Sequence, residues 1–307
     1  MPQLLRYISY LSPGIPQALF QTIIDYLAEA LETPTELRID GSTSGPRPEC
    51  NPLESGEAEF AWLCTPSYLW SLASDPLPVV LVPASMVFSD PRNNGRPYYH
   101  SDVVVHRDSS VRCFGQLRDG RWSYNDNSSQ SGYYNVLEQL AEMDAPLTFF
   151  ASMTASGSHL ESLRRVAAGD TDAAAIDSNV LASYLATHPE LARSVRVLTT
   201  WGPHAVQPLV AAPHVAPAVI ADVAVALRDM HTTEYGEALA RFGVTKFVTV
   251  DQEFYSAEAA SVKAGESVIS CQESLEDRCR RRPRDPAWTT SETSPRDATR
   301  GRARSAR

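Results

Sequence analysis

Cysteine is scarce in this sequence and follows no pattern. The five cysteines form no CxxC pair and show no metal-type spacing to histidine, and an odd number does not indicate a disulfide framework. Cys64 lies in an apolar run and is expected to be a small core residue. We therefore expect no metal site and no cofactor held by cysteine, and the sequence gives no other indication of a cofactor.

Long hydrophobic runs are also missing. No segment approaches the 18 or more uninterrupted apolar residues of a membrane span. The N-terminal stretch MPQLLRYISYLSPGIPQALF lacks a basic region followed by a short apolar one, so it does not read as a signal peptide. As written, the chain is expected in the cytoplasm. A start codon assigned too late would instead place it in the periplasm or at the cell surface.

An excess of positive charge is absent too, since the net charge is −10. This balance argues against a nucleic-acid binder. From Cys271 onward ten arginines face six acidic residues, which makes this tail +4 and leaves the rest at −14. An acidic body of this kind can bind an anion only through local dipoles and hydroxyl groups.

Motifs of known catalytic machinery are not found. The sequence has no G-x-S-x-G, no Walker loop and no H-E-x-x-H. Ser158 and His159 are neighbours in the sequence only, and the other histidines are scattered. We therefore expect no catalytic residue.

What the sequence does contain is a regular alternation of strand-like and helix-like segments. Hydrophobic residues make up 43% of the chain and aromatic residues 8%, as in a globular protein with a real core. The alternation predicts an α/β architecture with largely parallel sheets. Strands are expected at 5–11, 36–40, 59–64, 79–82, 85–88, 101–106, 121–124, 147–150, 173–176, 195–200, 208–211 and 247–250. Helices are expected at 15–31, 66–72, 111–117, 133–143, 159–168, 179–187, 217–230 and 234–242.

The stretch from Tyr124 to Tyr133, YNDNSSQSGY, is the most informative part of the chain. A strand-like run ends here and leads through Ser128, Ser129 and Ser131 into a periodic helix. The first amides of a helix lack intrahelical partners and the helix dipole favours negative charge, so this turn suits an anion with several acceptor oxygens. A serine-rich helix cap without a ligand is the alternative.

Four segments in order resemble the phosphate/phosphite/phosphonate substrate-binding protein family of ABC transporters. They are FAWLCTPSYLW (Phe60 to Trp70), YYHSDVVVHRDSSV (Tyr98 to Val111), NSSQSGY (Asn127 to Tyr133) and SGSHLESLRRVAAGDTDAAAIDS (Ser156 to Ser178). The resemblance covers roughly Leu4 to Tyr255 and implies a two-lobed type II periplasmic-binding-protein fold. Each lobe would be a mostly parallel sheet flanked by helices, with two crossover strands as the hinge.

The same resemblance implies how the chain divides. Residues 1–99 and 198–255 would form lobe 1, and residues 100–197 would form lobe 2 with the serine-rich loop. Residues 256–307 contain few apolar side chains and many Arg, Pro, Ser and Thr, and we expect a disordered basic tail. The run CRRRPR could bind an acidic surface or remain solvated.

In this family the anion lies in the interlobe cleft, at the start of the helix after the Ser/Thr loop. By motif, Ser129, Gln130 and Ser131 occupy the positions of a Ser-Thr-Ser sequence. The two serines keep a hydroxyl donor each. Gln130 stands where threonine is usual, and it retains donors on a longer side chain.

Four further residues are expected at the ligand by the same resemblance. His159 would donate to an oxyanion oxygen, or else only begin its helix. Asp177 ends a buried strand and would pair with a ligand amine or accept from a protonated oxyanion, or else cap the next helix. Tyr68 and Tyr99 would add phenolic donors and an apolar wall.

These expectations point to a solute-binding protein that captures phosphonate, phosphite or phosphate, with an ABC permease as a possible partner. Two alternatives stay open. One is a cytoplasmic enzyme of cofactor or secondary metabolism on the same fold, and the other is a cytosolic ligand sensor. Turnover separates the first from the binding protein, because a binding protein returns its ligand unchanged.

Overall fold

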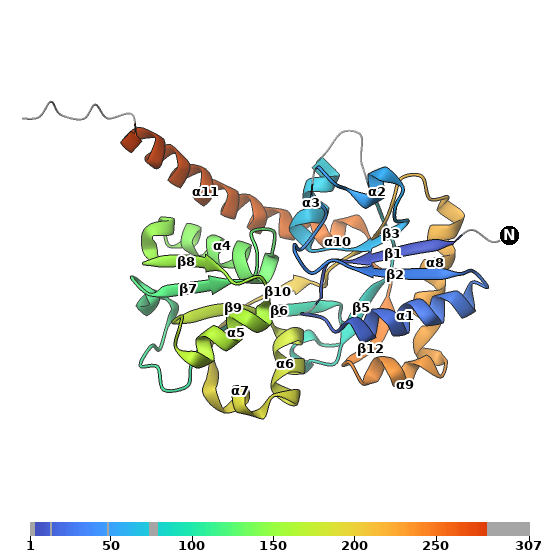
Figure 1. The fold of residues 1–307 in the computed structure, drawn as a ribbon, viewed down its shortest axis with the longest axis horizontal. Coiled ribbons are helices and arrows are strands. Elements are labelled where there is room, and N and C mark those ends of the chain that lie inside the picture. The colour runs from blue at the N-terminus through green and yellow to red at the C-terminus, as the bar shows by residue number, and fades with distance from the viewer. Residues whose placement is uncertain (1–3, 13, 48, 74–78, 281–307) are drawn as a thin grey trace, which may run out of the picture.

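The computed structural model describes residues 4–12, 14–47, 49–73 and 79–280, with side chains described as far as residue 272. Figure 1 shows two bodies side by side, each built on a sheet flanked by helices. One five-stranded sheet has the order β2-β1-β3-β11-β4 and the other the order β10-β6-β9-β7-β8. A short two-stranded sheet, β12-β5, accompanies the first. The predicted α/β two-lobed class is confirmed.

Lobe 1 is built on the first of these sheets and the two-stranded sheet. Strands β2, β1 and β3 run parallel, whereas β11 runs antiparallel to both β3 and β4. Helix α1 packs on this lobe because Leu19, Phe20, Ile23, Ile24 and Leu27 recur at helical spacing on one buried face. Its elements are β1 (Leu5–Ser9), α1 (Gln17–Ala30), β2 (Thr35–Ile39), α2 (Pro52–Ser55), β3 (Phe60–Trp62), α3 (Thr65–Ala73), β4 (Val80–Leu81), β5 (Ser85–Phe88), η1 (Pro91–Asn93), β11 (Leu209–Ala211), α8 (Pro217–Asp229), η5 (Met230–Thr232), α9 (Tyr235–Ala240), β12 (Val244–Val248) and α10 (Gln252–Ser256).

Lobe 2 is built on the second sheet, with α4 on one side and α5, α6 and α7 on the other (Figure 1). Strands β9, β7 and β8 are parallel, while β6 runs antiparallel to both β9 and β10. Both sheets are thus mixed, with a parallel half and an antiparallel half. The elements are β6 (Tyr98–His106), η2 (Phe114–Leu117), β7 (Arg121–Tyr124), η3 (Gln130–Tyr134), α4 (Asn135–Glu142), η4 (Leu147–Phe149), β8 (Ser152–Ala155), α5 (His159–Ala168), β9 (Ala173–Asp177), α6 (Ser178–Thr187), α7 (Pro189–Ser194) and β10 (Val195–Ala205).

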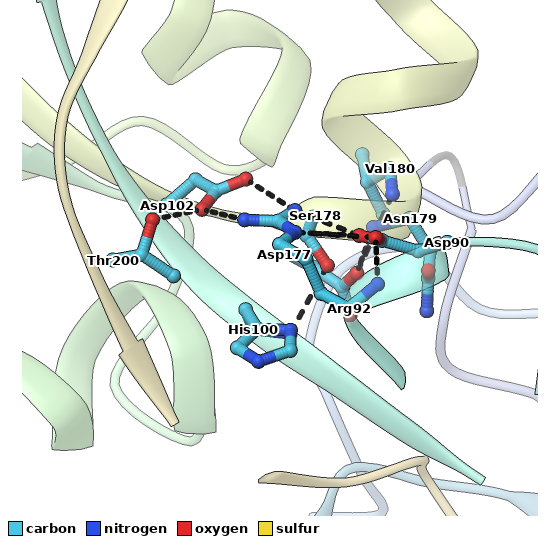
Figure 2. A network of polar contacts seen from close by, with 9 residues as sticks. All are labelled: Asp90, Arg92, His100, Asp102, Asp177, Ser178, Asn179, Val180 and Thr200. Atoms are coloured by element: carbon cyan, nitrogen blue, oxygen red, sulfur yellow. Dashed lines mark hydrogen bonds and ion pairs between the residues drawn. The ribbon is translucent and has the colours of Figure 1, made fainter. Parts of the chain in front are cut away.

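The long strands β6 and β10 pair with each other and connect the lobes. An ion-pair cluster lies beside them, as Figure 2 shows: Arg92 of η1 binds Asp102 of β6 at 2.9 Å and Asp90 at 2.7 Å. Thr200 of β10 donates to the same Asp102 at 2.7 Å. Burial alone would raise the pKa of Asp90, but the hydrogen bonds from Arg92 hold it below its usual value. This cluster fixes lobe 1 to both crossover strands.

Two sequence-based predictions of structure are wrong, and two others have shifted bounds: only Phe114–Leu117 of the helix expected at 111–117 is helical, and the strand expected at 247–250 is β12 (Val244–Val248). Residues 147–150 are predicted as a strand, but Leu147–Phe149 form the turn η4, and Phe149 and Phe150 enter the core of lobe 2. The strand of this region is β8, which lies at the sheet edge with largely exposed side chains and therefore lacks a hydrophobic signature. The short helices α2, α7 and α10 were not foreseen.

The second correction concerns the expected disordered tail from residue 256. Glu258–Arg280 form helix α11, which packs along α4 and also contacts α3. Its buried face consists of Glu258, Ser261, Val262, Gly265 and Val268, at helical spacing. Composition missed this helix because most of that face is small or polar. Residues 281–307, with most of the basic run, lie outside the described residues.

Candidate ligand-binding site

A small cavity lies where the two lobes meet, and five predicted or neighbouring motif residues line it together: Ser129, Ser131, Ser158, His159 and Asp177. Lobe 1 contributes the turn after β1, with Tyr10, Ser12 and Ile15, and the loop after β2, with Thr43 and Ser44. The cavity measures about 50 Å³. One water needs roughly 10–15 Å³ on the same measure, so the space suits a ligand of a few heavy atoms.

The serine-rich loop (Asn127–Gly132) enters its helix through an unusual first turn. Gln130–Tyr134 form a π-helical turn, η3, that continues into α4. Ser129 caps the turn by accepting a hydrogen bond from the Gly132 amide at 3.2 Å. Gly132 is required here, because a Cβ atom would lie 2.1 Å from the Asn125 side-chain oxygen. Two serines of this turn, Ser129 and Ser131, line the cavity.

His159 is the first residue of α5, and Ser158 caps this helix by accepting from the Glu161 amide at 3.1 Å. The Nε2 atom of His159 lies 3.1 Å from the Ser131 hydroxyl, and the Nδ1 atom of His159 is buried without a hydrogen-bond partner. Burial lowers the pKa of His159 to about 4, against the weaker opposing effect of Asp126. The imidazole is therefore neutral at pH 7, and its residue lines the cavity.

Asp177 caps α6, which is one of the two roles that the sequence left open, and it also lines the cavity. One carboxylate oxygen caps α6 by accepting from the Asn179 amide at 2.8 Å, and the other accepts from Gln207 at 2.9 Å. Burial raises the pKa of Asp177 to about 6, although these hydrogen bonds oppose the shift. The carboxyl group can therefore be protonated in mildly acidic solution and donate to a ligand oxygen.

The electrostatic character of the cavity comes from helix ends and not from cations. Among the described residues that line it there is no arginine or lysine, whereas Asp126 and Asp177 are present. The N-termini of η3–α4, α5 and α6 converge on it and present their positive dipole ends. In the described part of the chain no group of three His, Cys, Asp or Glu side chains could hold a metal ion. Such a wall favours a small anion that carries hydrogen-bond acceptors.

Asp126 joins the lobes at the rim of the cavity, and sequence reasoning missed it. Its carboxylate accepts from the Ser44 hydroxyl of lobe 1 at 2.5 Å and from the Ser128 amide at 2.8 Å. Asn125, Gln207 and the turn after β1 were missed as well. The signal that could have found Ser44 and Ser12 is their place just after the carboxyl ends of β2 and β1, where open α/β sheets put ligand groups.

Three predicted residues do not line the cavity. Tyr68 and Tyr99 are fully buried, and among the described residues the Tyr68 hydroxyl has no hydrogen-bond partner, whereas that of Tyr99 lies against Ser131. Burial raises the pKa of Tyr68 to about 12 and that of Tyr99 well above its usual value. The side chain of Gln130 points away from the cavity and donates to Asn135 at 2.7 Å and to Ser261 at 3.1 Å.

Comparison with known proteins agrees with this architecture. A family model described as the periplasmic substrate-binding protein of phosphonate ABC transporters matches residues 5–255. The chain belongs to this family of transport substrate-binding proteins. No curated protein sequence matches it significantly. No described helix has both the length and the apolar character that crossing a membrane requires.

Solved structures with the same fold are distant in sequence. A binding protein component of an ABC phosphonate transporter from Pseudomonas aeruginosa is 14% identical, with a TM-score of 0.69 over 91% of this chain and 99% of that one. A protein from Prochlorococcus marinus solved in complex with methylphosphonate is 13% identical, with a TM-score of 0.71 over 86% and 98%. A protein from Xanthomonas citri bound to chloride ion is 18% identical, with a TM-score of 0.67 over 87% and 99%.

Proposed function

We propose that this protein captures a small phosphorus oxyanion in the interlobe cavity and delivers it to an ABC permease. The observation that carries the proposal is the convergence of Ser129, Ser131 and His159 on one small cavity at three helix N-termini. Family membership supports the transport role. Hinge closure around a ligand is the known behaviour of two-lobed folds.

The lobe division proposed from the sequence fits this role. Residues 1–99 and 198–255 would move as one body, and residues 100–197 as the other. The contact between Ser44 and Asp126 would then form only when the lobes close, since these residues come from opposite sides of the cavity. Tyr68 and Tyr99 would support the site from behind, within the core.

The size of the cavity selects among candidate ligands. A space of about 50 Å³ fits phosphite, phosphate or methylphosphonate, whereas an aminoalkyl chain would require the cavity to widen. We therefore expect the ligand to be one of these small species. A binding protein returns its ligand unchanged, and membership of a transport family supports a binder over an enzyme. A site of action outside the cytoplasmic membrane follows from the same family and is part of the proposal.

Calorimetry on protein freed of co-purified ligand tests the proposal. Phosphite, phosphate, methylphosphonate and 2-aminoethylphosphonate are titrated separately, and recovered ligand is checked by phosphorus NMR. We expect tight binding of at least one of the three small species, with the ligand recovered intact. Binding of none of the four would sink the proposal, and chemical conversion of a bound ligand would replace it with an enzyme.

A further inference from the structure

The first turn of helix α11 is connected to the serine-rich loop through a buried chain of polar side chains. We propose that Glu258 and Ser261 of this helix are positioning residues for the ligand site, acting through His204, Asn135 and Gln130. The matched family model ends at residue 255, so this helix lies beyond it. The inference rests on the proposed function, because the position of η3 matters for binding only if η3 holds the ligand.

The chain of contacts begins at Gln130, the first residue of η3. Its side-chain nitrogen donates to the Asn135 oxygen at 2.7 Å and to the Ser261 hydroxyl at 3.1 Å. The Asn135 nitrogen lies 2.9 Å from Nε2 of His204 on the crossover strand β10. Nδ1 of His204 lies 3.0 Å from one oxygen of Glu258, whose other oxygen accepts from the Ala205 amide at 2.8 Å.

The direction of each hydrogen bond in this chain is determined by its neighbours. Glu258 is an acceptor, so His204 carries its proton on Nδ1 and its Nε2 accepts from the Asn135 amide nitrogen. Asn135 then turns its oxygen toward Gln130, whose nitrogen is a donor. The Ser261 hydroxyl passes its own proton on to Glu138 at 2.8 Å. A neutral His204 with the opposite tautomer would break the chain at two contacts.

Because these side chains are buried, each of them needs its hydrogen-bond partner. Gln130 and Asn135 are fully buried, and His204, Glu258 and Ser261 are nearly so. Each buried polar group that loses its partner carries a desolvation cost, so the chain holds its members in one geometry. The one atom in it without a partner is the Gln130 side-chain oxygen.

The result is a fixed start for the helix that faces the ligand. The Gln130 side chain is held by α11 and, through Asn135, by the hinge strand, while its backbone amide donates to Cys64 of lobe 1 at 3.4 Å. Helix α11 also reaches lobe 1 through Glu266, which accepts from the Trp70 indole at 2.9 Å. The Gln130 side chain thus serves to orient the adjacent Ser129 and Ser131, and this explains a glutamine at a position where the family pattern has threonine.

The test compares Glu258→Gln and Ser261→Ala with Val268→Ala, which loosens the same helix outside the chain of contacts. In the ligand-free protein, nitrogen NMR should find the His204 proton on Nδ1. Glu258→Gln should speed hydrogen exchange of the backbone amides at 131–134 and weaken methylphosphonate binding, each about tenfold, since it disrupts contacts to a buried charge. Ser261→Ala should act in the same direction by about threefold. Val268→Ala should lower the melting temperature and change neither quantity.

Two results would overturn the inference. One is a His204 proton on Nε2, and the other is an effect of Ser261→Ala on exchange no larger than that of Val268→Ala. Should Glu258→Gln fail to fold, Ser261→Ala still decides. Should the native protein bind no methylphosphonate, the proposed function fails for that ligand, while NMR and exchange in the free protein still judge the positioning role.

Discussion

Ser129, Ser131 and His159 are separated by up to 30 positions in the sequence, yet they meet at one cavity wall. Two of them, Ser129 and Ser131, come from one turn, and His159 begins the neighbouring helix α5. Ser129 and Ser131 carry one hydroxyl donor each and neutral His159 carries one N–H, but the contact between Ser131 and His159 uses one of these protons, so two donors remain for an anion. In an acidic protein with no cation in the cavity, each such donor should matter to an anionic ligand.

Replacing any one of these three residues by alanine removes a contact to a desolvated anion. We expect a loss of about 1.5–3 kcal/mol each, or roughly ten- to a hundredfold in Kd for the best-bound phosphorus oxyanion. Calorimetry measures the change. Ser109→Ala, at a hydroxyl far from the cavity, is the matched control and should bind like the native protein. If the three variants lose only stability and keep native affinity, these residues are helix caps and not ligand contacts.

Asp177 and His159 should have opposite effects on stability between about pH 4 and 6. The pKa of Asp177 is raised from 3.8 to about 6, so the folded state holds the extra proton and stability falls as pH rises through this window. The pKa of His159 is lowered from 6.5 to about 4, so the unfolded state holds the extra proton and stability rises with pH. In the native protein these two slopes largely cancel.

Asp177→Asn should therefore reveal the pH dependence that His159 alone gives to the unfolding free energy. We expect the unfolding free energy of this variant to fall by up to about 1.4 kcal/mol per pH unit, relative to the native protein, as pH drops from 6 to 4. His159→Gln should have the opposite effect, so that its unfolding free energy rises relative to the native protein as pH drops from 6 to 4. Denaturant melts at half-unit pH steps measure both. Parallel profiles for the three proteins would show that neither group titrates as its burial implies.

At the scale of elements, helix α11 is the largest departure from what the sequence indicated. A cut after Gly265 should remove the burial of Val268 and the contact between Glu266 and Trp70. We expect it to cost about 2 kcal/mol of stability, the usual value for burying an aliphatic side chain. Thermal melts compare it with a cut after Arg280, which leaves α11 whole. An equal melting temperature for the two truncated proteins would mean that this half of the helix does not stabilise the fold.

Elements with local signals were predictable. Helix α5 was predicted over its observed length, because Ser158 marks its start and Gly169 its end. The buried strand β9, with its run of alanines, was equally clear. The edge strand β8 and helix α11 were missed, since the side chains that define them are polar or small and their packing comes from partners far away in the sequence.

The candidate site also contains residues that have local sequence signals and residues that do not. Ser129, Ser131, His159 and Asp177 lie at capped helix starts or at a strand end, and both have local signatures. The contact of Ser44 with Asp126 joins two loops from different lobes, and that of Gln207 with Asp177 joins residues 30 positions apart. No single segment encodes such pairs. Tyr68 and Tyr99 occupy matching motif positions but lie behind the cavity wall, where packing determines their place.

At the scale of the whole molecule, a pair of crossover strands joins the two lobes (Figure 1). The cavity is lined by residues of both lobes. A chain with a net charge of −10 cannot attract an anion over long distances. It can hold one through short-range dipoles, provided that the lobes close and exclude water. The contact between Ser44 and Asp126 links the two lobes at the cavity.

A crystal structure of the native protein grown with methylphosphonate tests the central claim most directly. The account predicts the phosphorus atom inside the cavity, with its oxygens within hydrogen-bond distance of Ser129 and of the Ser131–His159 pair. It also predicts that Gln130 remains turned away from the ligand, toward Asn135 and Ser261. A ligand bound elsewhere, or a phosphonate in the cavity that touches neither the serine-rich loop nor His159, would contradict it.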